Sequence, residues 1–396
     1  MSELYRNFVS GFCSHANLEV KGAGEGPLHG RSFAVKDIID VAGQTTGAGN
    51  PDWYEAHEPA EQHASAVQLL LNAGADMAGK TITEEFAYGL IGENFHYGTP
   101  INPRVEGGVS GGSSSGSASV VASEMVDFAL GTDTGGSVRV PASFCGLYGI
   151  RPSHGRVPLG GILPLAPSLD TCGWFAREAE LFRDIGKVLL DWTDCAPPTR
   201  VLLAEDAFEL ADDSVRSALA SAIAHVAAHL GEPKIVRPSE MSLLQGYAAW
   251  QSAMQITRGS EGAASHLAWI RASDAAMGPG FRERFEAGGS YTRDQIAEAM
   301  TRRAIVEGFM AGLLGENTVM LVPAAPSAAP PSSADEAVYD RLRNHNELYN
   351  CTAPLARLPQ LSLPLGETEA GPVGLGIIAG HGQDEMLLDL AVALTA

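Results

Sequence analysis

Residues 107–141, GGVSGGSSSGSASVVASEMVDFALGTDTGGSVRVP, carry most of the recognisable chemistry of this 396-residue chain. They contain a Gly/Ser-rich loop at 111–116, an apolar segment, and a second glycine turn that ends on Ser137. Glycine lets the backbone approach a ligand closely and aim N–H groups at it. Serines placed among such glycines are candidate nucleophiles, so the stretch could be a phosphate-binding loop, a flexible linker or a hydrolase site.

The first two interpretations fit the residues poorly. A phosphate-binding loop needs a lysine followed by Ser or Thr after its last glycine, but Ser117, Ala118 and Ser119 follow here. Apolar segments with regular spacing lie close on both sides, which is not typical of a flexible linker. The stretch therefore favours a serine hydrolase.

A serine hydrolase needs a base and an oxyanion hole besides its nucleophile. Ser137 follows two glycines, and N–H groups of small residues can bind a developing oxyanion. The candidate base is Lys36, which interrupts the apolar run GRSFAVKDIIDV at 30–41. It could be an ion-paired or solvent-reaching lysine beside Asp37, or a desolvated lysine whose lowered pKa makes it a base.

Charge and composition exclude several classes of protein. Lys and Arg number 26 against 47 Asp and Glu, a formal charge of −21 that disfavours nucleic acid and anionic membranes. The sequence has no run of about 18 apolar residues and no basic start followed by an apolar run, so we expect no membrane span and no secretory signal. The five cysteines are widely spaced without C-x-x-C, so we expect no disulfide framework, no metal site and a cytoplasmic location.

Strand-like and helix-like segments alternate along the chain. The expected strands are 33–35 with 38–41, 75–78, 200–204, 318–322, 360–365 and 373–379. Residues 142–150 are expected to run from a helix into a strand. The other expected helices are 61–72, a helix near 83–88, 178–192, 214–230, most of 239–314, 339–350 and 384–394. This order predicts an α/β fold with a mixed, mostly parallel sheet covered by helices on both faces. We expect one domain, 1–396, with core motifs at 30–160 and a helical, substrate-side region at about 239–314.

Four separated motifs carry a family resemblance: AVKDIIDVAG (34–43), GGSSSGSA (111–118), GTDTGGSVRVPA (131–142) and FCGLYGIRPSHGRV (144–157). Together they resemble the amidase signature family, in which the two serines corresponding to Ser113 and Ser137 have the same spacing. PVGLGIIAGHGQDEMLL (372–388) is similar to the closing strand and helix of that family. The resemblance implies the amidase signature fold.

The resemblance also implies a catalytic triad. Ser137 matches the nucleophile that becomes acylated, Ser113 matches the bridging serine on a cis peptide bond, and Lys36 matches the catalytic lysine. Ser115 is a departure, because many members of the family have glycine there.

Residues beside the triad have supporting roles in this comparison. The oxyanion-hole segment of the family corresponds to Thr134, Gly135, Gly136 and Ser137. We expect Asp133 and Arg139 to pair and hold the nucleophile turn, and Ser114 to hydrogen-bond near the triad.

The implied activity is hydrolysis of a small-molecule carboxamide to a carboxylate and ammonia by a monomer or homodimer, with no metal, organic cofactor, nucleic acid or membrane. Segments 49–53, 92–100 and 170–177 resemble plant indole-3-acetamide hydrolases, which favours a primary arylacetamide such as indole-3-acetamide. Three alternatives remain open at this point. They are a ureide, carbamate or acylamide hydrolase of the same family, the amidase subunit of a tRNA-dependent amidotransferase, and a catalytically silent binding protein.

Overall fold

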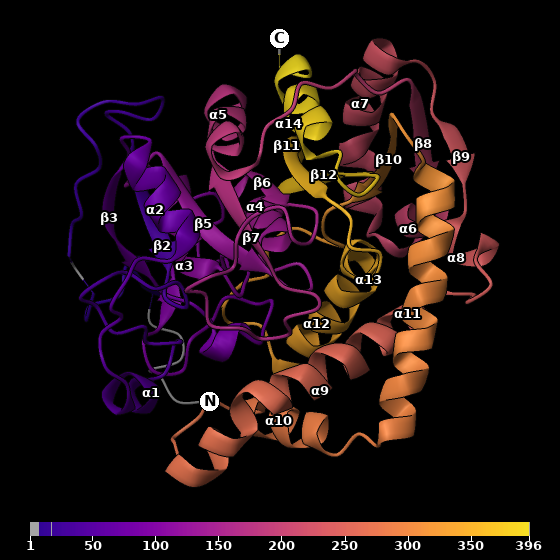
Figure 1. Ribbon diagram of the computed structural model, residues 1–396. Helices are drawn as coiled ribbons and strands as arrows, with labels where there is room; N and C mark the ends of the chain where they lie inside the picture. Colours follow the sequence, from indigo (N-terminus) through magenta and orange to yellow (C-terminus); the bar gives the residue numbers. More distant parts are fainter. Residues whose placement is uncertain (1–7, 17, 396) are drawn as a thin grey trace.

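A ten-stranded sheet runs through the computed structural model, which describes residues 8–16 and 18–395 (Figure 1). Its strand order is β3-β2-β5-β7-β6-β11-β12-β10-β8-β9. The strands are β2 (Ser32–Lys36), β3 (Asp76–Thr81), β5 (Phe128–Asp133), β6 (Tyr148–Arg151), β7 (Thr171–Ala176), β8 (Arg200–Ala204), β9 (Lys234–Val236), β10 (Thr318–Pro323), β11 (Gln360–Thr368) and β12 (Gly371–Ala379). A separate pair joins β1 (Phe8–Val9) to β4 (Thr99–Pro100).

Parallel and antiparallel pairs occupy different parts of this sheet. The pairs among β3, β2 and β5 at one end, and among β10, β8 and β9 at the other, are parallel. From β5 through β7, β6, β11 and β12 to β10, every pair is antiparallel. The predicted mixed sheet is confirmed, and its parallel pairing lies at the two ends.

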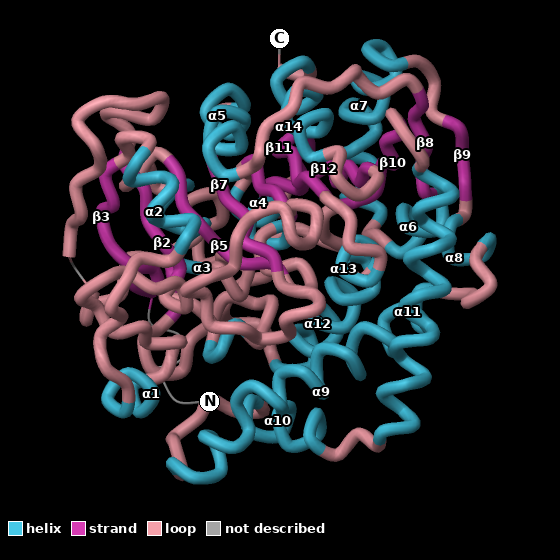
Figure 2. The backbone as a smooth tube through the Cα atoms, viewed as in Figure 1, coloured by secondary structure: helices cyan, strands magenta, loops and turns pink. Residues whose placement is uncertain are grey.

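Helices cover both faces of the sheet (Figures 1 and 2). They are α1 (Pro51–Ala56), α2 (Ser65–Asn72), α3 (Ser115–Ala122), α4 (Arg139–Cys145), α5 (Ala179–Leu189), α6 (Glu205–Leu210), α7 (Asp213–Leu230), α8 (Pro238–Met241), α9 (Tyr247–Ser273), α10 (Phe281–Gly289), α11 (Arg293–Leu314), α12 (Glu336–Asn350), α13 (Thr352–Leu355) and α14 (Asp384–Ala393). One layer contains α2, α5, α14 and α7, and α3 and α4 pack on the other face. Figure 1 shows α9 and α10 along the lower edge and α11 at the right.

Alternation along the strands decides which side chains meet which helices. In β2, Phe33 and Val35 belong to the largest apolar cluster, whereas Ala34 belongs to the cluster under α3 and α4. β5 follows the same rule, with Ala129 under α3 and α4. This period of two is expected of strands buried on both faces. The small residues on one face let α3 and α4 lie close to the strands.

Two local predictions need correction. Residues near 83–88 form only a 3₁₀ turn, Glu85–Ala87, because Phe86 and Ala87 have φ of 51° and 58°, which a helix cannot accommodate. The strands β5, β7 and β9 were not among the expected ones. The β5 sequence FALGTD is buried throughout and lacks the polar alternation of a half-exposed strand, so its pattern alone did not identify it.

No helix within 8–16 and 18–395 is both long enough and apolar enough to cross a bilayer.

A pair of glycine substitutions tests the close packing of α3 on β5. A Cβ at Gly131 would lie 2.8 Å from Oγ of Ser114 and 2.9 Å from Cε2 of Phe175, so Gly131→Ala should destabilise the fold by about 1–3 kcal/mol. Gly308→Ala on α11 is the matched control, because its Cβ would meet nothing within 4 Å, and it should stabilise by about 0.5–1 kcal/mol. Urea unfolding of both variants measures the difference, and equal midpoints would contradict the packing described.

Candidate active site

The ends of two parallel strands bring the first two site residues together. β2 and β5 pair in parallel with Val35 opposite Leu130, and Lys36 and Asp133 are the last residues of their strands. Carboxyl ends of parallel neighbours meet at the same edge of a sheet. The loops that follow this edge contain the remaining candidates.

Lys36 is fully buried and has no carboxylate partner in the described part of the chain. Its Nζ donates to Oγ of Ser113 at 2.7 Å and to Oγ1 of Thr132 at 2.9 Å. Burial lowers the pKa of Lys36 to about 7, although nearby carboxylates, Glu84 first among them, oppose the shift. Asp37 pairs instead with Lys80, whose Nζ lies 2.8 Å from its Oδ1. Of the two interpretations of Lys36, the structure supports the desolvated lysine.

Ser113 lies in the first glycine loop, immediately before α3. The Gly112–Ser113 peptide bond is cis. The carbonyl of Ser113 accepts the N–H of Glu84 at 3.2 Å, and a side chain at position 112 would overlap the Glu84 carboxylate. Glu84 is itself buried, which raises its pKa, and accepts the N–H of Gly92 at 2.6 Å. Glycine is therefore required where this loop crosses the buried carboxylate.

Ser114 makes the expected hydrogen bonds beside Ser113 and Ser137. Its N–H donates to the carbonyl of Ser137 at 3.3 Å, which joins the two glycine turns. Its hydroxyl accepts the N–H of Thr132 and donates to the carbonyl of the same residue, both at 3.3 Å. Ser114 thus holds the loop of Ser113 against both β5 and the turn of Ser137.

The turn that contains Ser137, residues 134–138, is the predicted nucleophile turn. It is organised around the carboxylate of Asp133. Oδ1 accepts the N–H of Gly136 at 2.9 Å, and Oδ2 accepts the N–H of Val138 at 3.1 Å. Arg139 binds the same carboxylate with two donors, Nη2 at 2.8 Å and Nε at 3.0 Å. The predicted pairing of Asp133 with Arg139 is confirmed, in the two-pronged geometry that makes such pairs strong.

A second arginine completes this buried group. Arg151 donates from Nη1 to Oδ1 of Asp133 at 3.3 Å and from Nη2 to the carbonyl of Leu169 at 2.7 Å. Burial alone would raise the pKa of Asp133, but the charges and hydrogen bonds of Arg139 and Arg151 hold it well below its usual range. Asp133 is therefore ionised at neutral pH.

The expected oxyanion hole is reduced by one donor. Gly136 has φ of 124°, which requires glycine, and its N–H is engaged by Asp133. The prediction that the N–H of Gly136 donates to the oxyanion is therefore wrong, because that N–H holds the turn in place. The N–H groups of Thr134, Gly135 and Ser137 donate to no other group within 8–16 and 18–395, and all three residues line the pocket described below.

Sequence reasoning missed several supporting residues. Thr132 holds Lys36, and Asp170 accepts the hydroxyl of Thr134 at 2.5 Å and two further backbone N–H groups. Thr132 lies in the motif 131–142 and Asp170 in the motif 170–177. Their place in these motifs was the signal that could have identified them. Arg151 also lies in such a motif, but its contact with Asp133 depends on the distant pairing of β6 with β7.

A pocket of about 250 Å³ opens beside Ser137. Its floor includes the nucleophile turn and the loop 87–90, and its walls come from α9, α10 and α12. The polar side chains that line it are Gln255, Arg258, Arg284, Asp340, Arg343, Asn344 and Glu347. A smaller cavity of about 150 Å³, mostly apolar, shares Ala87, Thr134 and Leu165 with it. The helices α9, α10 and α12 contain no local motif that predicts a pocket, and only the tertiary fold places them beside Ser137.

Comparison with known proteins agrees with this geometry. The family model described as Amidase matches residues 14–388. The chain belongs to the amidase family.

Two plant proteins named Amidase 1 are similar to this amidase over nearly their whole length. The one from Oryza sativa subsp. japonica is 38% identical over 393 residues, which cover 93% of this chain and 90% of that protein. The one from Arabidopsis thaliana is 38% identical over 400 residues and 93% of both chains. A solved structure described as a crystal structure of amidase superposes with a TM-score of 0.83 at 30% identity, covering 94% of this chain and 85% of that one. The chain is an amide-hydrolysing enzyme with the amidase fold.

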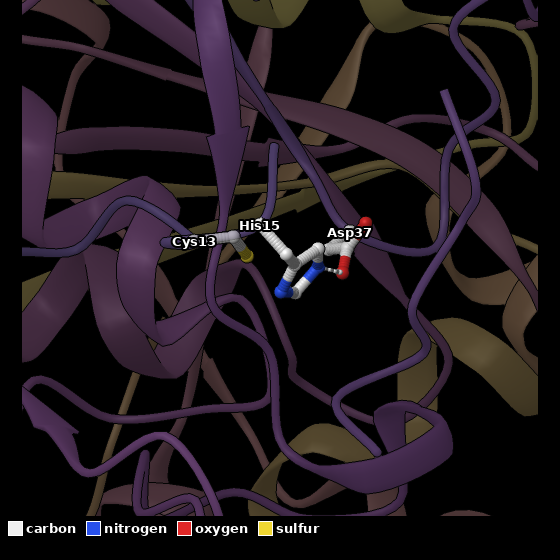
Figure 3. Close-up of side chains that lie close together, drawn as sticks. All are labelled: Cys13, His15 and Asp37. Carbon is white, nitrogen blue, oxygen red and sulfur yellow. Dashed lines mark hydrogen bonds and ion pairs between the residues drawn. The ribbon is translucent and has the colours of Figure 1, made fainter. Parts of the chain in front are cut away.

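One cluster in this amidase has metal-binding residue types. Cys13, His15 and Asp37 place one donor atom each within 4.8 Å of one another (Figure 3). Asp37, however, is already bound by Lys80 at 2.8 Å and by Nε2 of His15 at 2.9 Å. Burial and the Asp37 charge raise the pKa of the Cys13 thiol well above its usual value, whereas a metal needs the thiolate. The cluster fits a buried ion-pair network better than a metal site.

Two arginine substitutions test how far the amidase depends on Asp133. Arg139→Met removes the main partner of a fully buried carboxylate and should destabilise the fold by about 3–5 kcal/mol. Arg302→Met on α11 is the control, since its pair with Glu298 is exposed, and it should change stability by less than about 0.5 kcal/mol. Denaturant unfolding measures both, and a small loss for Arg139→Met would contradict the role assigned to Asp133.

Proposed function

We propose that this amidase hydrolyses a small-molecule carboxamide to a carboxylate and ammonia through an acyl-enzyme on Ser137. One observation carries the proposal. The buried amine of Lys36 lies 2.7 Å from the hydroxyl of Ser113, in a loop that is hydrogen-bonded to the Ser137 turn. The pocket beside Ser137 gives a small amide access to the Ser137 hydroxyl.

Proton transfer begins at Lys36. With a pKa of about 7, a large share of Lys36 is neutral near neutral pH, and its lone pair can accept the Ser113 proton at the observed distance. Ser113 in turn takes the proton of Ser137 as the Ser137 oxygen attacks the amide carbonyl carbon. Two successive proton transfers thus activate the nucleophile without a histidine.

Attack on the carbonyl carbon forms a tetrahedral intermediate, and its oxyanion has to be stabilised. The N–H groups of Thr134, Gly135 and Ser137 are the unengaged donors at the turn among the described residues, and each donor of this kind contributes about 3 kcal/mol. When the C–N bond breaks, the proton returns through Ser113 to the leaving nitrogen, and ammonia departs. Water then attacks the acyl-enzyme and loses its proton along the same path, which releases the carboxylate and restores Ser137.

The acyl group has to fit the pocket. The sequence resemblance to indole-3-acetamide hydrolases suggests a primary arylacetamide, and Ala87, Leu90 and Leu165 supply apolar lining that an aromatic ring could contact. Neutral arylacetamides are therefore the first substrates to assay.

Loss of the Ser137 hydroxyl tests the acyl-enzyme. Ser137→Ala should lower amide turnover by roughly 10³-fold or more while leaving the fold intact, because attack then lacks its nucleophile. A fluorophosphonate should label Ser137 of the unsubstituted protein, as mass spectrometry would detect. Ser123→Ala, at the end of α3, is the control and should retain full turnover. Appreciable turnover by Ser137→Ala would reject the mechanism.

The pH dependence tests Lys36. Because the pKa of Lys36 is lowered to about 7 and only the neutral amine accepts a proton, kcat/KM should rise with pH through about pH 7 and level off above it. Lys36→Ala should lose most activity, and its residual rate should lack this ionisation. An acid limb that persists unchanged in Lys36→Ala would show that another group is titrating.

A further inference from the structure

The pocket beside Ser137 is cationic in a strongly acidic protein. The chain carries a formal charge of −21, yet three arginines and only two carboxylates line this pocket. Glu347 is paired with Arg258 at 2.6 Å, and Asp340 with Arg343 at 2.7 Å. Each of these carboxylates thus has its cation, and Arg343 also pairs with Glu336 at 2.7 Å, whereas Arg284 has no ion pair among the described residues.

Arg258 connects this charge to the nucleophile turn. The residue is only 9% exposed, and its Nη1 lies 3.5 Å from the place that a Cβ of Gly135 would occupy. Nη2 binds Glu347, but the buried Nε has no acceptor in the described residues. A buried guanidinium with an unmatched N–H costs free energy that a bound acceptor would recover.

Arg284 is the guanidinium without a carboxylate. Within 8–16 and 18–395 it forms no ion pair, and its one hydrogen bond runs from Nη1 to the carbonyl of Tyr88 at 2.9 Å. The guanidinium lies over the ring of Phe281, 4.7 Å from its centroid, which fixes the plane of the fork. Burial and the like charge of Arg343 lower the pKa of Arg284, and the charge of the buried Glu84 opposes this shift only in part. Such a site is preorganised for an anionic ligand.

We propose that Arg284, with Arg258 beside it, forms a subsite for a carboxylate, and that the preferred substrates of this amidase are monoamides of dicarboxylic acids. The planar, two-pronged donor set of arginine matches a carboxylate. In a primary amide everything except the nitrogen belongs to the acyl part, so the carboxylate binds the arginines while the amide carbon reaches Ser137. A neutral arylacetamide is then the poorer substrate. The inference rests on the proposed amide hydrolysis and names its substrate class.

Matched substrates separate charge from shape. The monoamides of succinic, glutaric and adipic acid are compared with the corresponding diamides, which have nearly the same shape but no charge, and with phenylacetamide. At least one monoamide should be hydrolysed with a kcat/KM about tenfold or more above that of its diamide. Arg284→Gln should remove most of this preference, chiefly by raising KM for the monoamide.

Two further variants complete the series. Arg284→Lys keeps the charge without the fork and should retain part of the preference. Arg271→Gln is the matched control on α9, where Arg271 is exposed and paired with Glu286 away from the pocket, and it should behave as the unsubstituted protein. Arg284 is the better position to vary than Arg258, because its removal leaves no carboxylate unpaired.

A binding measurement separates this inference from the proposed function. In Ser137→Ala, isothermal titration with succinate, glutarate and adipate should detect binding of at least one of them, weakened about tenfold or more by adding Arg284→Gln. If neutral amides are hydrolysed as well as the monoamides, or the dicarboxylates bind equally with and without Arg284, the subsite is rejected while amide hydrolysis stands. If no amide is hydrolysed, the proposed function fails, and dicarboxylate binding alone decides whether the subsite exists.

Discussion

The carboxylate of Asp133 ties three separate elements into one arrangement. It ends β5, receives two N–H groups of the nucleophile turn, and is held by Arg139 at the start of α4 and Arg151 on β6. Arg139 extends the group further, since its Nη1 donates to Oε1 of Gln360 on β11 at 2.6 Å. A buried charge is stable only when it is paired and its hydrogen-bonding capacity is filled. Position and orientation of the Ser137 turn therefore follow from satisfying one buried anion.

Lys36 presents the opposite electrostatic situation. It is as deeply buried as Asp133, but its contacts are two hydroxyl groups and no carboxylate, so the neutral form is favoured and the pKa falls to about 7. Asp37, next to it in the chain, is paired with Lys80 and His15 and so is not available to charge Lys36. One paired anion and one unpaired amine thus lie at the ends of neighbouring parallel strands, and they place a fixed scaffold beside the proposed base.

Small residues on one face of the sheet make this proximity possible. Gly131 and Ala129 on β5 leave room for α3 and for Ser114, whose hydrogen bonds join the two glycine turns. The opposite face, filled with large side chains, supplies most of the hydrophobic burial. The proposed substrate pocket lies elsewhere, and its helical lining comes from α9, α10 and α12.

Local patterns in the sequence determined the α/β class, most strands and helices, and the motif residues Lys36, Ser113 and Ser137, because glycine turns and apolar periodicity are properties of short segments. The same patterns suggested the pairing of Asp133 with Arg139, which lie six positions apart. They missed β7 and Arg151, and they assigned Gly136 a donor role that its bond to Asp133 excludes. Only the tertiary structure decided how Lys36 is desolvated and which arginines line the pocket beside Ser137. Burial and the charge around a group depend on segments distant in the chain, which no local pattern records.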